Sequence, residues 1–257
     1  MIELKNIHKT FDDREILKGI STVFEKGKTN LIIGQSGSGK TVLMKCIVGL
    51  FEPTGGEVLY DGRNFFGMSK KERTFLRREM GMIFQNAALF DSMTVLDNVR
   101  FPLDMFSTLS WRDRQRKANE CLERVNLKGA ESKLPGEISG GMQKRVAIAR
   151  AISMNPKYLF CDEPNSGLDP QTSLVIDELI HGITQDYGMT TIINTHDMNS
   201  VMGIGENILF LYNGRKEWQG NKDEVMTSSN ELLNNFIFAS DLFRKVKKAE
   251  LEEEGKQ

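Results

Sequence analysis

The chain has 257 residues, of which 39% are hydrophobic and 27% are charged, and its formal net charge is −1. This composition is typical of a globular protein, and the lack of a basic surplus argues against a nucleic-acid partner. No apolar run approaches the roughly 18 residues that a membrane-spanning helix needs, and residues 1–5 lack the apolar core of a signal peptide. If the protein works at a membrane, we expect other chains to supply the spanning part.

The beginning of the chain predicts an antiparallel β layer. Residues 2–8 and 16–24 have the composition of strands. A third run of this kind, 57–60, ends at the turn Asp61-Gly62. We expect these runs to pair with one another near the N-terminus.

Three further short runs of apolar or β-branched residues have the pattern of buried parallel strands. They lie at 31–33, 157–161 and 190–194, and each is followed at once by polar or glycine residues. In open α/β sheets, ligands bind outside the carboxyl ends of the strands. We therefore predict an α/β fold with a mostly parallel core sheet and functional residues at those ends.

The segment Gly34–Thr41 has a glycine, four residues and then Gly-Lys-Thr, which is the pattern of a phosphate-binding loop. It lies between the apolar run 31–33 and a helical pattern over 42–50, as the motif requires. The glycines let successive N–H groups point at phosphate oxygens, and the helix start adds further N–H groups. We predict that this loop binds the phosphates of a nucleotide, that Lys40 neutralises the β- and γ-phosphates, and that Thr41 holds Mg²⁺. The predicted nucleotide-binding residues here are Gly34, Gln35, Ser36, Gly37, Ser38, Gly39, Lys40, Thr41 and Val42.

The apolar run 157–161 ends in two carboxylates, Asp162 and Glu163. In a protein with a phosphate-binding loop, the first acid can orient the shell of Mg²⁺, and the second can polarise the attacking water. Two surface acids at a strand end are the plain alternative. The loop at Gly34–Thr41 favours the functional interpretation.

A helical region is predicted over about 86–153. Within it, Ser110 and Asp113 have the spacing of a helix cap, and a stripe of apolar residues after them is typical of core packing. Near the end, 207–219 predicts a hairpin around Asn213-Gly214. We interpret 1–225 as one domain with this inserted helical subdomain, followed by a C-terminal helical extension over 226–257.

The stretch Ile138–Gln143 contains Ser-Gly-Gly and opens a strongly helical run. It resembles the signature of the ABC-transporter ATPase family, which lies between the phosphate-binding loop and the acidic strand end. Met142 departs from the glutamine usual there, and Gly167 stands where alanine is common in the family's D-loop. The resemblance covers about residues 2–225 and implies a P-loop ATPase fold with an N-terminal antiparallel layer.

The resemblance also implies site residues beyond the phosphate-binding loop. Gln85 corresponds to the family's Q-loop glutamine and His196 to its switch histidine, so with Glu163 they are the predicted catalytic residues. Phe11 lies where the family places an aromatic that stacks on adenine, although a single aromatic beside a strand is more often core. The predicted metal ligands are Thr41, Gln85 and Asp162, and the remaining predicted nucleotide contacts are Ser139, Gly140, Gly141 and Asp169.

The same resemblance implies a second copy of the chain as partner. In the family, the signature helix faces away from its own phosphate-binding loop. Ser139 and the N–H groups after it would reach the γ-phosphate held by the other copy. Two ATP molecules would then join two chains, and hydrolysis would release them, which supplies a two-state element.

The residues that follow Gln85 are the basis for predicting which substrate is transported. The segments 89–95, 98–99 and 101–103 read Leu-Phe-Asp-Ser-Met-Thr-Val, Asn-Val and Phe-Pro-Leu. They resemble the ATPase subunits of Mla-type, MCE-associated phospholipid transporters, and in the family this region receives a helix of the permease. The implied role is phospholipid transport between the inner and outer membranes, from the cytoplasmic face of the inner membrane, with permease subunits and an MCE-domain protein as partners.

Other functions stay open at this point. A small-solute importer, for example for amino acids or methionine, would use the same ATPase machinery. An ABC ATPase without a transport role is a third possibility. The apolar residues between 232 and 246 either pack on the chain's own core or clasp the second copy.

Overall fold

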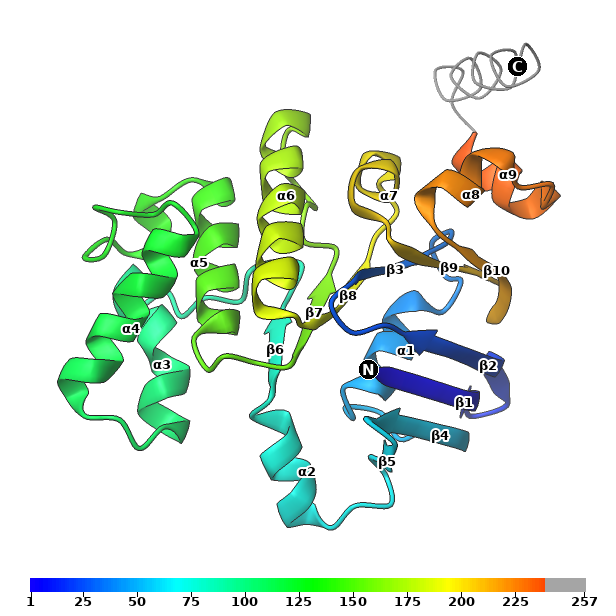
Figure 1. Ribbon diagram of the computed structural model, residues 1–257, viewed down its shortest axis with the longest axis horizontal. Helices are drawn as coiled ribbons and strands as arrows, with labels where there is room; N and C mark the ends of the chain where they lie inside the picture. The colour runs from blue at the N-terminus through cyan, green and yellow to red at the C-terminus, as the bar shows by residue number, and fades with distance from the viewer. Residues whose placement is uncertain (239–257) are drawn as a thin grey trace.

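The structure is a computed structural model that describes residues 1–238. The remainder of the extension predicted for 226–257, and with it part of the predicted clasp, lies outside the described residues. Two sheets and the helices around them build the fold (Figure 1). Among the helices within residues 1–238, none is long and apolar enough to cross a membrane.

The first sheet is the antiparallel layer expected near the N-terminus. Its strands follow the order β2-β1-β4-β5, and β1 pairs in antiparallel register with both β2 and β4. Their bounds are Ile2–Phe11 for β1, Arg14–Phe24 for β2, Gly55–Tyr60 for β4 and Arg63–Asn64 for β5. One face of β1 packs inward, because Ile2, Leu4 and Ile7 are buried.

The second sheet follows the order β10-β9-β3-β8-β7-β6, and the pairs from β9 to β6 are parallel. Strand β10 adds an antiparallel edge through the predicted hairpin, in which Asn213 and Gly214 both have positive φ. The bounds are Thr29–Ile33 for β3, Met80–Ile83 for β6, Tyr158–Asp162 for β7, Thr190–Asn194 for β8, Asn207–Tyr212 for β9 and Arg215–Gly220 for β10. The predicted fold class is therefore confirmed.

Helices cover both faces of the core sheet, which explains why β3, β7 and β8 are buried along almost their whole length. Leu31 and Ile33 of β3 face the cluster that contains helices α3 to α6, whereas Ile32 faces α1 and the antiparallel sheet. The helices are α1 (Lys40–Ile47), α2 (Lys70–Arg77), α3 (Val95–Phe106), α4 (Trp111–Arg124), α5 (Gly140–Ile152), α6 (Pro170–Tyr187), α7 (Met198–Ile204), α8 (Lys222–Thr227) and α9 (Glu231–Ile237), with a short 3₁₀ turn at Pro135–Glu137.

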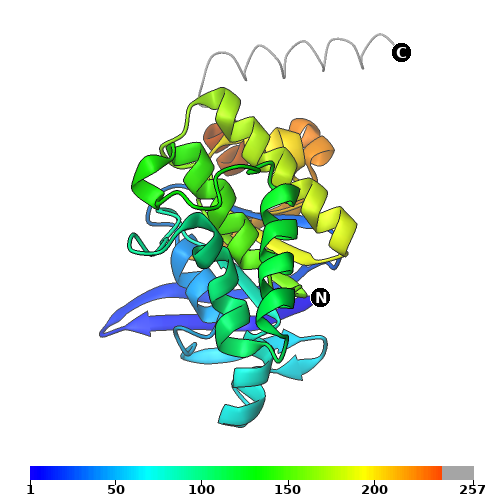
Figure 2. The ribbon, with the colours of Figure 1, turned by 90° about the vertical axis from the view of Figure 1, so that its left-hand side faces the viewer.

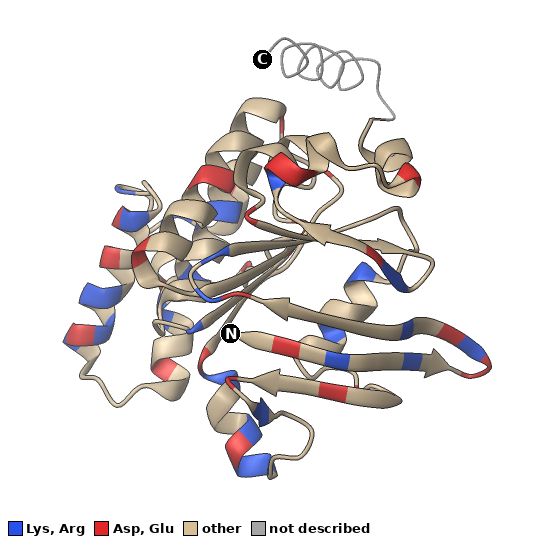
Figure 3. Ribbon diagram, turned by 45° about the vertical axis from the view of Figure 1, so that its right-hand side comes forward, with Lys and Arg blue, Asp and Glu red and all other residues tan. Residues whose placement is uncertain are grey.

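Helices α3, α4 and α5 pack together to one side of the core sheet, as Figure 2 shows from that side. The Ser110 hydroxyl accepts a hydrogen bond from the Asp113 backbone N–H at 3.2 Å, so the predicted cap of α4 forms. Helix α2 and strand β6 were absent from the sequence prediction. Basic and acidic positions are interspersed along the ribbon, and α2 carries several basic residues beside the single acid Glu72 (Figure 3).

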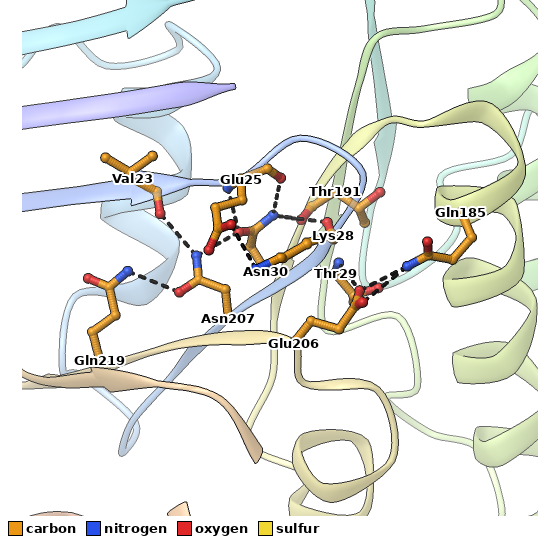
Figure 4. A network of polar contacts seen from close by, with 10 residues as sticks. All are labelled: Val23, Glu25, Lys28, Thr29, Asn30, Gln185, Thr191, Glu206, Asn207 and Gln219. Carbon is orange, nitrogen blue, oxygen red and sulfur yellow. Dashed lines mark hydrogen bonds and ion pairs between the residues drawn. The ribbon is translucent and has the colours of Figure 1, made fainter. Parts of the chain in front are cut away.

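A buried asparagine fixes the amino end of β3. The Asn30 side chain is fully buried, and its Nδ2 donates toward the carbonyl oxygens of Glu25, Lys28 and Thr191 at 2.9–3.0 Å. Its Oδ1 accepts from the Glu25 backbone N–H at 2.8 Å and from Asn207 Nδ2 at 2.7 Å. One side chain thus joins β3, β8, β9 and the loop that follows β2 (Figure 4).

The network continues from Asn207 to the antiparallel sheet and to β10. Asn207 Nδ2 also donates to the Val23 carbonyl at 2.9 Å, and Gln219 Nε2 donates to Asn207 Oδ1 at 3.0 Å. On the far side, Glu206 accepts from the Thr29 backbone N–H at 2.8 Å and from Gln185 of α6 at 3.1 Å (Figure 4). Side-chain hydrogen bonds therefore join the two sheets at the amino end of β3.

Replacing Asn30 tests this connection. Asn30→Ala leaves the Glu25 N–H and the Asn207 amide without their acceptor in a buried setting, so we expect a loss of about 3 kcal/mol in unfolding free energy. This corresponds to a fall in Tm of roughly 6–12 °C for a chain of this size. The matched control is Asn119→Ala, a half-buried asparagine of α4 outside the network. Equal melting temperatures for both variants would contradict the argument.

Candidate functional site

The segment Gly34–Gly39 turns sharply between β3 and α1, and glycine is required at its two ends. Gly34 has φ +149°, and a Cβ there would lie 2.3 Å from the Leu211 carbonyl oxygen. Gly39, at the N-cap of α1, has φ +105°, and its Cβ would meet the Leu17 side chain at 2.9 Å. The loop consequently packs closely on β9 and β2, with the N-terminus of α1 at its end.

Lys40 extends back along this loop. The residue is 7% exposed, and its Nζ donates to the Gly34 carbonyl at 2.7 Å and to the Gln35 carbonyl at 3.1 Å. Burial lowers the pKa of Lys40, while the charges of Glu163 and Asp162 act in the opposite direction. Ser38 Oγ is buried and has no hydrogen-bond partner within residues 1–238. A buried ammonium with neutral partners and an unpaired hydroxyl are the features expected of a cradle for phosphate oxygens.

A cavity of about 810 Å³ opens in front of the loop. Arg14 and Ile16 of β2 form one wall, Glu163 and His196 another, and Phe236 of α9 reaches it from near the C-terminal end of the described chain. Most of the predicted loop residues line it as well: Gly34, Gln35, Ser36, Gly37, Gly39, Lys40, Thr41 and Val42. No sequence motif marked Arg14, Ile16 or Phe236.

The three predicted catalytic residues meet at one carboxylate. Glu163 Oε2 accepts a hydrogen bond from Gln85 Nε2 at 3.3 Å, and Oε1 lies 3.1 Å from His196 Nδ1. Glu163 has φ +47°, a left-handed conformation that costs a non-glycine residue roughly 1–2 kcal/mol, and its backbone N–H is held by the Asn194 carbonyl at 3.0 Å. Strain of this kind persists where the surroundings over-determine it, and it often marks a functional position.

Of the predicted metal ligands, Thr41 lines this cavity, whereas Asp162 and Gln85 are next to one of its lining residues: Asp162 precedes Glu163 in the chain, and Gln85 Nε2 donates to the Glu163 carboxylate. Thr41 starts the first turn of α1 and lines the cavity, and Asp162 ends β7 with its Oδ1 accepting from Asn194 Nδ2 at 2.9 Å. A hydroxyl, an amide and a carboxylate are oxygen donors of the kind that Mg²⁺ takes together with phosphate oxygens and water. The residues present therefore fit a magnesium–nucleotide complex.

Five predicted nucleotide contacts lie away from this cavity. The Phe11 ring packs edge-on against Phe51 at 5.3 Å, with Lys9 Nζ 4.9 Å from its centroid. Ser139 caps α5 by accepting from the Met142 N–H at 3.3 Å, and Asp169 caps α6 by accepting from the Thr172 N–H at 3.0 Å. Phe11, Ser139, Gly140, Gly141 and Asp169 are all absent from the lining, so their contacts with nucleotide stay predictions.

A buried carboxylate outside the cavity lining, that of Asp177, connects two of the loops that carry site residues. Asp177 of α6 is 3% exposed, and it accepts hydrogen bonds from Asn165 Nδ2 and from Ser200 Oγ, each at 2.7 Å. It ties the loop that follows Glu163 to α7, which follows His196. Burial raises the pKa of Asp177 to about 6, against the lowering effect of the two hydrogen bonds. Sequence reasoning missed this residue because it lies in no motif.

The comparisons with known proteins agree with this geometry. The family model described as ABC transporter matches residues 17–166. The chain belongs to the ABC transporter family. It is an ATPase subunit of that family, with an ATP-binding domain, and its phosphate-binding loop, acidic strand end and signature all lie within the matched range.

The relatives of this ABC ATPase carry names that refer to different substrates. Protein TRIGALACTOSYLDIACYLGLYCEROL 3 of Arabidopsis thaliana is 37% identical, over 93% of this chain and 74% of its own length. The methionine import ATP-binding protein MetN of Clostridioides difficile is also 37% identical, over 92% of this chain and 74% of its own length. The solved dimer of the ATP-binding cassette MJ0796, in a post-hydrolysis state with ADP and Pi, has a TM-score of 0.78 and 34% identity, covering 86% of this chain and 99% of its own.

The pKa of Asp177 predicts a pH-dependent stability. Because the folded-state pKa of about 6 exceeds the ordinary 3.8, the folded state binds the extra proton, and the stability it gives is lost as pH rises through 6. Between pH 4.5 and 7.5 this loss is about 2 kcal/mol. Asp177→Asn removes this loss; its amide oxygen can still accept from Asn165 Nδ2, and its amide N–H can donate to Ser200 Oγ, so its Tm relative to the unmodified chain should rise over that range. The exposed Asp13→Asn is the control, and parallel pH profiles for both variants would contradict the assignment.

Proposed function

We propose that Glu163 is the general base of ATP hydrolysis and that Gln85 and His196 orient it. Its carboxylate would accept a proton from the water that attacks the γ-phosphorus, while the bond from that phosphorus to the bridging oxygen breaks and ADP leaves. Lys40 and the N–H groups of the loop would hold the phosphates. Mg²⁺ held by Thr41, Asp162 and Gln85 would neutralise the charge that develops on the phosphate oxygens. Support comes from the contacts of Gln85 and His196 with the Glu163 carboxylate and from the left-handed backbone of Glu163.

A charge-neutral variant tests this base. Glu163→Gln keeps the size of the side chain and removes proton acceptance, so we expect ATP affinity to be retained and turnover to fall by at least about 100-fold. ATP should also trap a dimer that size-exclusion chromatography detects. Glu120→Gln, on the exposed surface of α4, serves as the control. Turnover at the normal rate would exclude Glu163 as the base.

We propose that the active form is a dimer in which each signature helix completes the other copy's site. Ser139, Gly140 and Gly141 start α5 outside the lining of their own cavity. The MJ0796 cassette, which this chain resembles, is itself dimeric with ADP and Pi. We also propose a division of the chain into three parts. These are a nucleotide-binding domain over 1–225, a helical subdomain inside it over about 86–153, and an extension over 226–257.

A permease helix is the proposed occupant of an apolar groove of about 540 Å³ between α2, β6 and α3. Phe84, Phe90 and Phe106 line it and are 41–47% exposed. Its rim is basic, and the Arg78 guanidinium lies 5.3 Å from the Phe75 ring and 5.6 Å from the Phe106 ring. An amphipathic helix fits a groove of this chemistry. The chain would thereby act peripherally, at the cytoplasmic face of the inner membrane.

The loop that forms one side of this groove is shaped by a buried amide. Asn98 is fully buried, and its Oδ1 accepts from the Phe90 N–H at 2.8 Å. Its Nδ2 lies 3.1 Å from the carbonyl oxygens of Phe90, Met93 and Thr94. The motif that suggested an Mla-type transporter is thus a loop closed around its own asparagine, with Phe90 turned outward.

We infer from this motif that the cargo is phospholipid, carried between the inner and outer membranes with an MCE-domain protein as further partner. A relative whose name refers to a galactolipid is consistent with a lipid substrate. A relative named for methionine import is equally identical, which makes a small-solute importer the second candidate. The observation that carries the lipid proposal is the sequence of 89–103, which comprises a loop and the first turns of α3, together with the shape of that loop.

Purification from native membranes separates the two candidates. Tagged chain, solubilised in detergent, should bring down a multi-span permease, an MCE-domain protein and phospholipid, identified by mass spectrometry. Phe90→Glu should lose all three while it keeps ATP affinity, because a charge would enter the apolar groove. Tyr187→Glu, an exposed aromatic at the end of α6, is the matched control. A permease accompanied by a solute-binding protein would contradict the lipid assignment.

A further inference from the structure

The loop after β6 begins in an unusual backbone conformation. Ala87 has φ 58° and Ala88 has φ 49°. A left-handed conformation costs each non-glycine residue roughly 1–2 kcal/mol, so contacts from elsewhere have to hold it. Within the loop, the Ala87 N–H donates to the Phe84 carbonyl at 2.9 Å. The Ala88 N–H donates to the Asn86 carbonyl at 2.6 Å, so the carbonyl groups of Gln85, Ala87 and Ala88 are left to be satisfied from outside the segment.

Two cationic side chains of α5 supply those contacts. Arg150 donates from Nη1 to the Ala88 carbonyl and from Nη2 to the Ala87 carbonyl, each at 2.7 Å. Lys144, which is 6% exposed, donates from Nζ to the Gln85 carbonyl. Burial lowers the pKa of both groups. Charged donors in such surroundings form strong hydrogen bonds to carbonyl oxygens, so the segment 85–88 is clamped to α5.

The clamped segment carries a catalytic side chain. Gln85 Nε2 reaches Glu163 Oε2 at 3.3 Å and Ser166 Oγ at 3.0 Å. Its backbone carbonyl is the atom that Lys144 holds. The position of the amide against the carboxylate therefore depends on where α5 holds the loop, and an error of about 1 Å in such a position can cost about 100-fold in rate.

The same loop touches the docking groove on its other side. Ala88 and Arg150 line the groove together with Phe84 and Phe90. Neither Lys144 nor Arg150 is among the residues that line the nucleotide cavity. Both side chains are thus placed to act through the loop rather than on the nucleotide.

We propose that Lys144 and Arg150 are positioning residues for ATP hydrolysis: they fix the backbone of 85–88 to α5 and thereby hold the Gln85 amide against Glu163. This inference rests on the roles proposed above for Glu163 and Gln85. Through these three hydrogen bonds, the signature helix α5 acts on the segment 85–88 of its own chain. A change in the groove and a change in α5 would both reach Glu163 by this route.

Steady-state kinetics of two variants test the clamp. Arg150→Gln and Lys144→Gln should each lower kcat about tenfold and leave the KM for ATP within about twofold, because orientation is lost and binding is kept. Lys144→Arg keeps a charged donor and should retain most of kcat. Arg116→Gln, which loses only surface ion pairs with Asp113 and Glu120 of α4, is the control. A rise in KM with unchanged kcat would overturn the proposal.

A double-mutant cycle separates positioning from a general loss of structure. In a Gln85→Ala background, Arg150→Gln should change kcat less than about twofold, since its effect passes through Gln85. Additive losses would overturn the clamp. If Arg150→Gln does not fold, Arg150→Lys takes its place, because lysine keeps the charge but cannot bridge both carbonyls in a planar fork. Full turnover in Glu163→Gln would instead refute the proposed base, independently of the cycle.

Discussion

The buried amide of Asn30 holds β3 at the end opposite to the phosphate-binding loop, and the geometry of the nucleotide cavity depends on this attachment. β3 is short and lies between β8 and β9, so its place in the sheet decides where Gly34 begins its turn. Through Asn207 the same contacts fix β2, whose other end brings Arg14 and Ile16 to the cavity wall. The positions of two walls of the cavity are therefore set by polar groups at the strand ends that lie away from it.

At the carboxyl ends of the core strands, the Glu163 carboxylate brings together side chains from separate loops. Glu163 receives Gln85 from the loop after β6 and His196 from the loop after β8, and it follows directly on β7. Each of these loops is held by a separate polar anchor: Lys144 and Arg150 hold the first, and Asp177 joins the loop after Glu163 to α7. Because these anchors are hydrogen bonds, they fix the direction as well as the distance at which each loop is held.

Local sequence patterns predicted the secondary structure around residues that lie in short motifs. The strand, loop and helix around Lys40, the acids after β7 and the cap of α4 were all predicted in place, because each depends on neighbours a few residues away. Helix α2 carried an equally local signal, the capping box of Ser69 and Glu72, which the prediction did not use. In contrast, Ile16 and Phe236 line the cavity only because distant segments fold together. The acceptors that the Asn30 amide and the Arg150 guanidinium bind are backbone carbonyls, and a sequence does not mark such acceptors.

The internal closure of the Phe90–Thr94 loop has a consequence for how transporters of this family diverge. Since Asn98 satisfies the loop from within, the rings that project outward make no hydrogen bond on which the loop depends. Phe90, which is 42% exposed, can then be exchanged for another side chain while the backbone of the loop beneath it stays unchanged. At the groove proposed to receive a permease helix, selection on the partner would act on Phe90 and selection on folding would act on Asn98, so the surface could change while the loop keeps its shape.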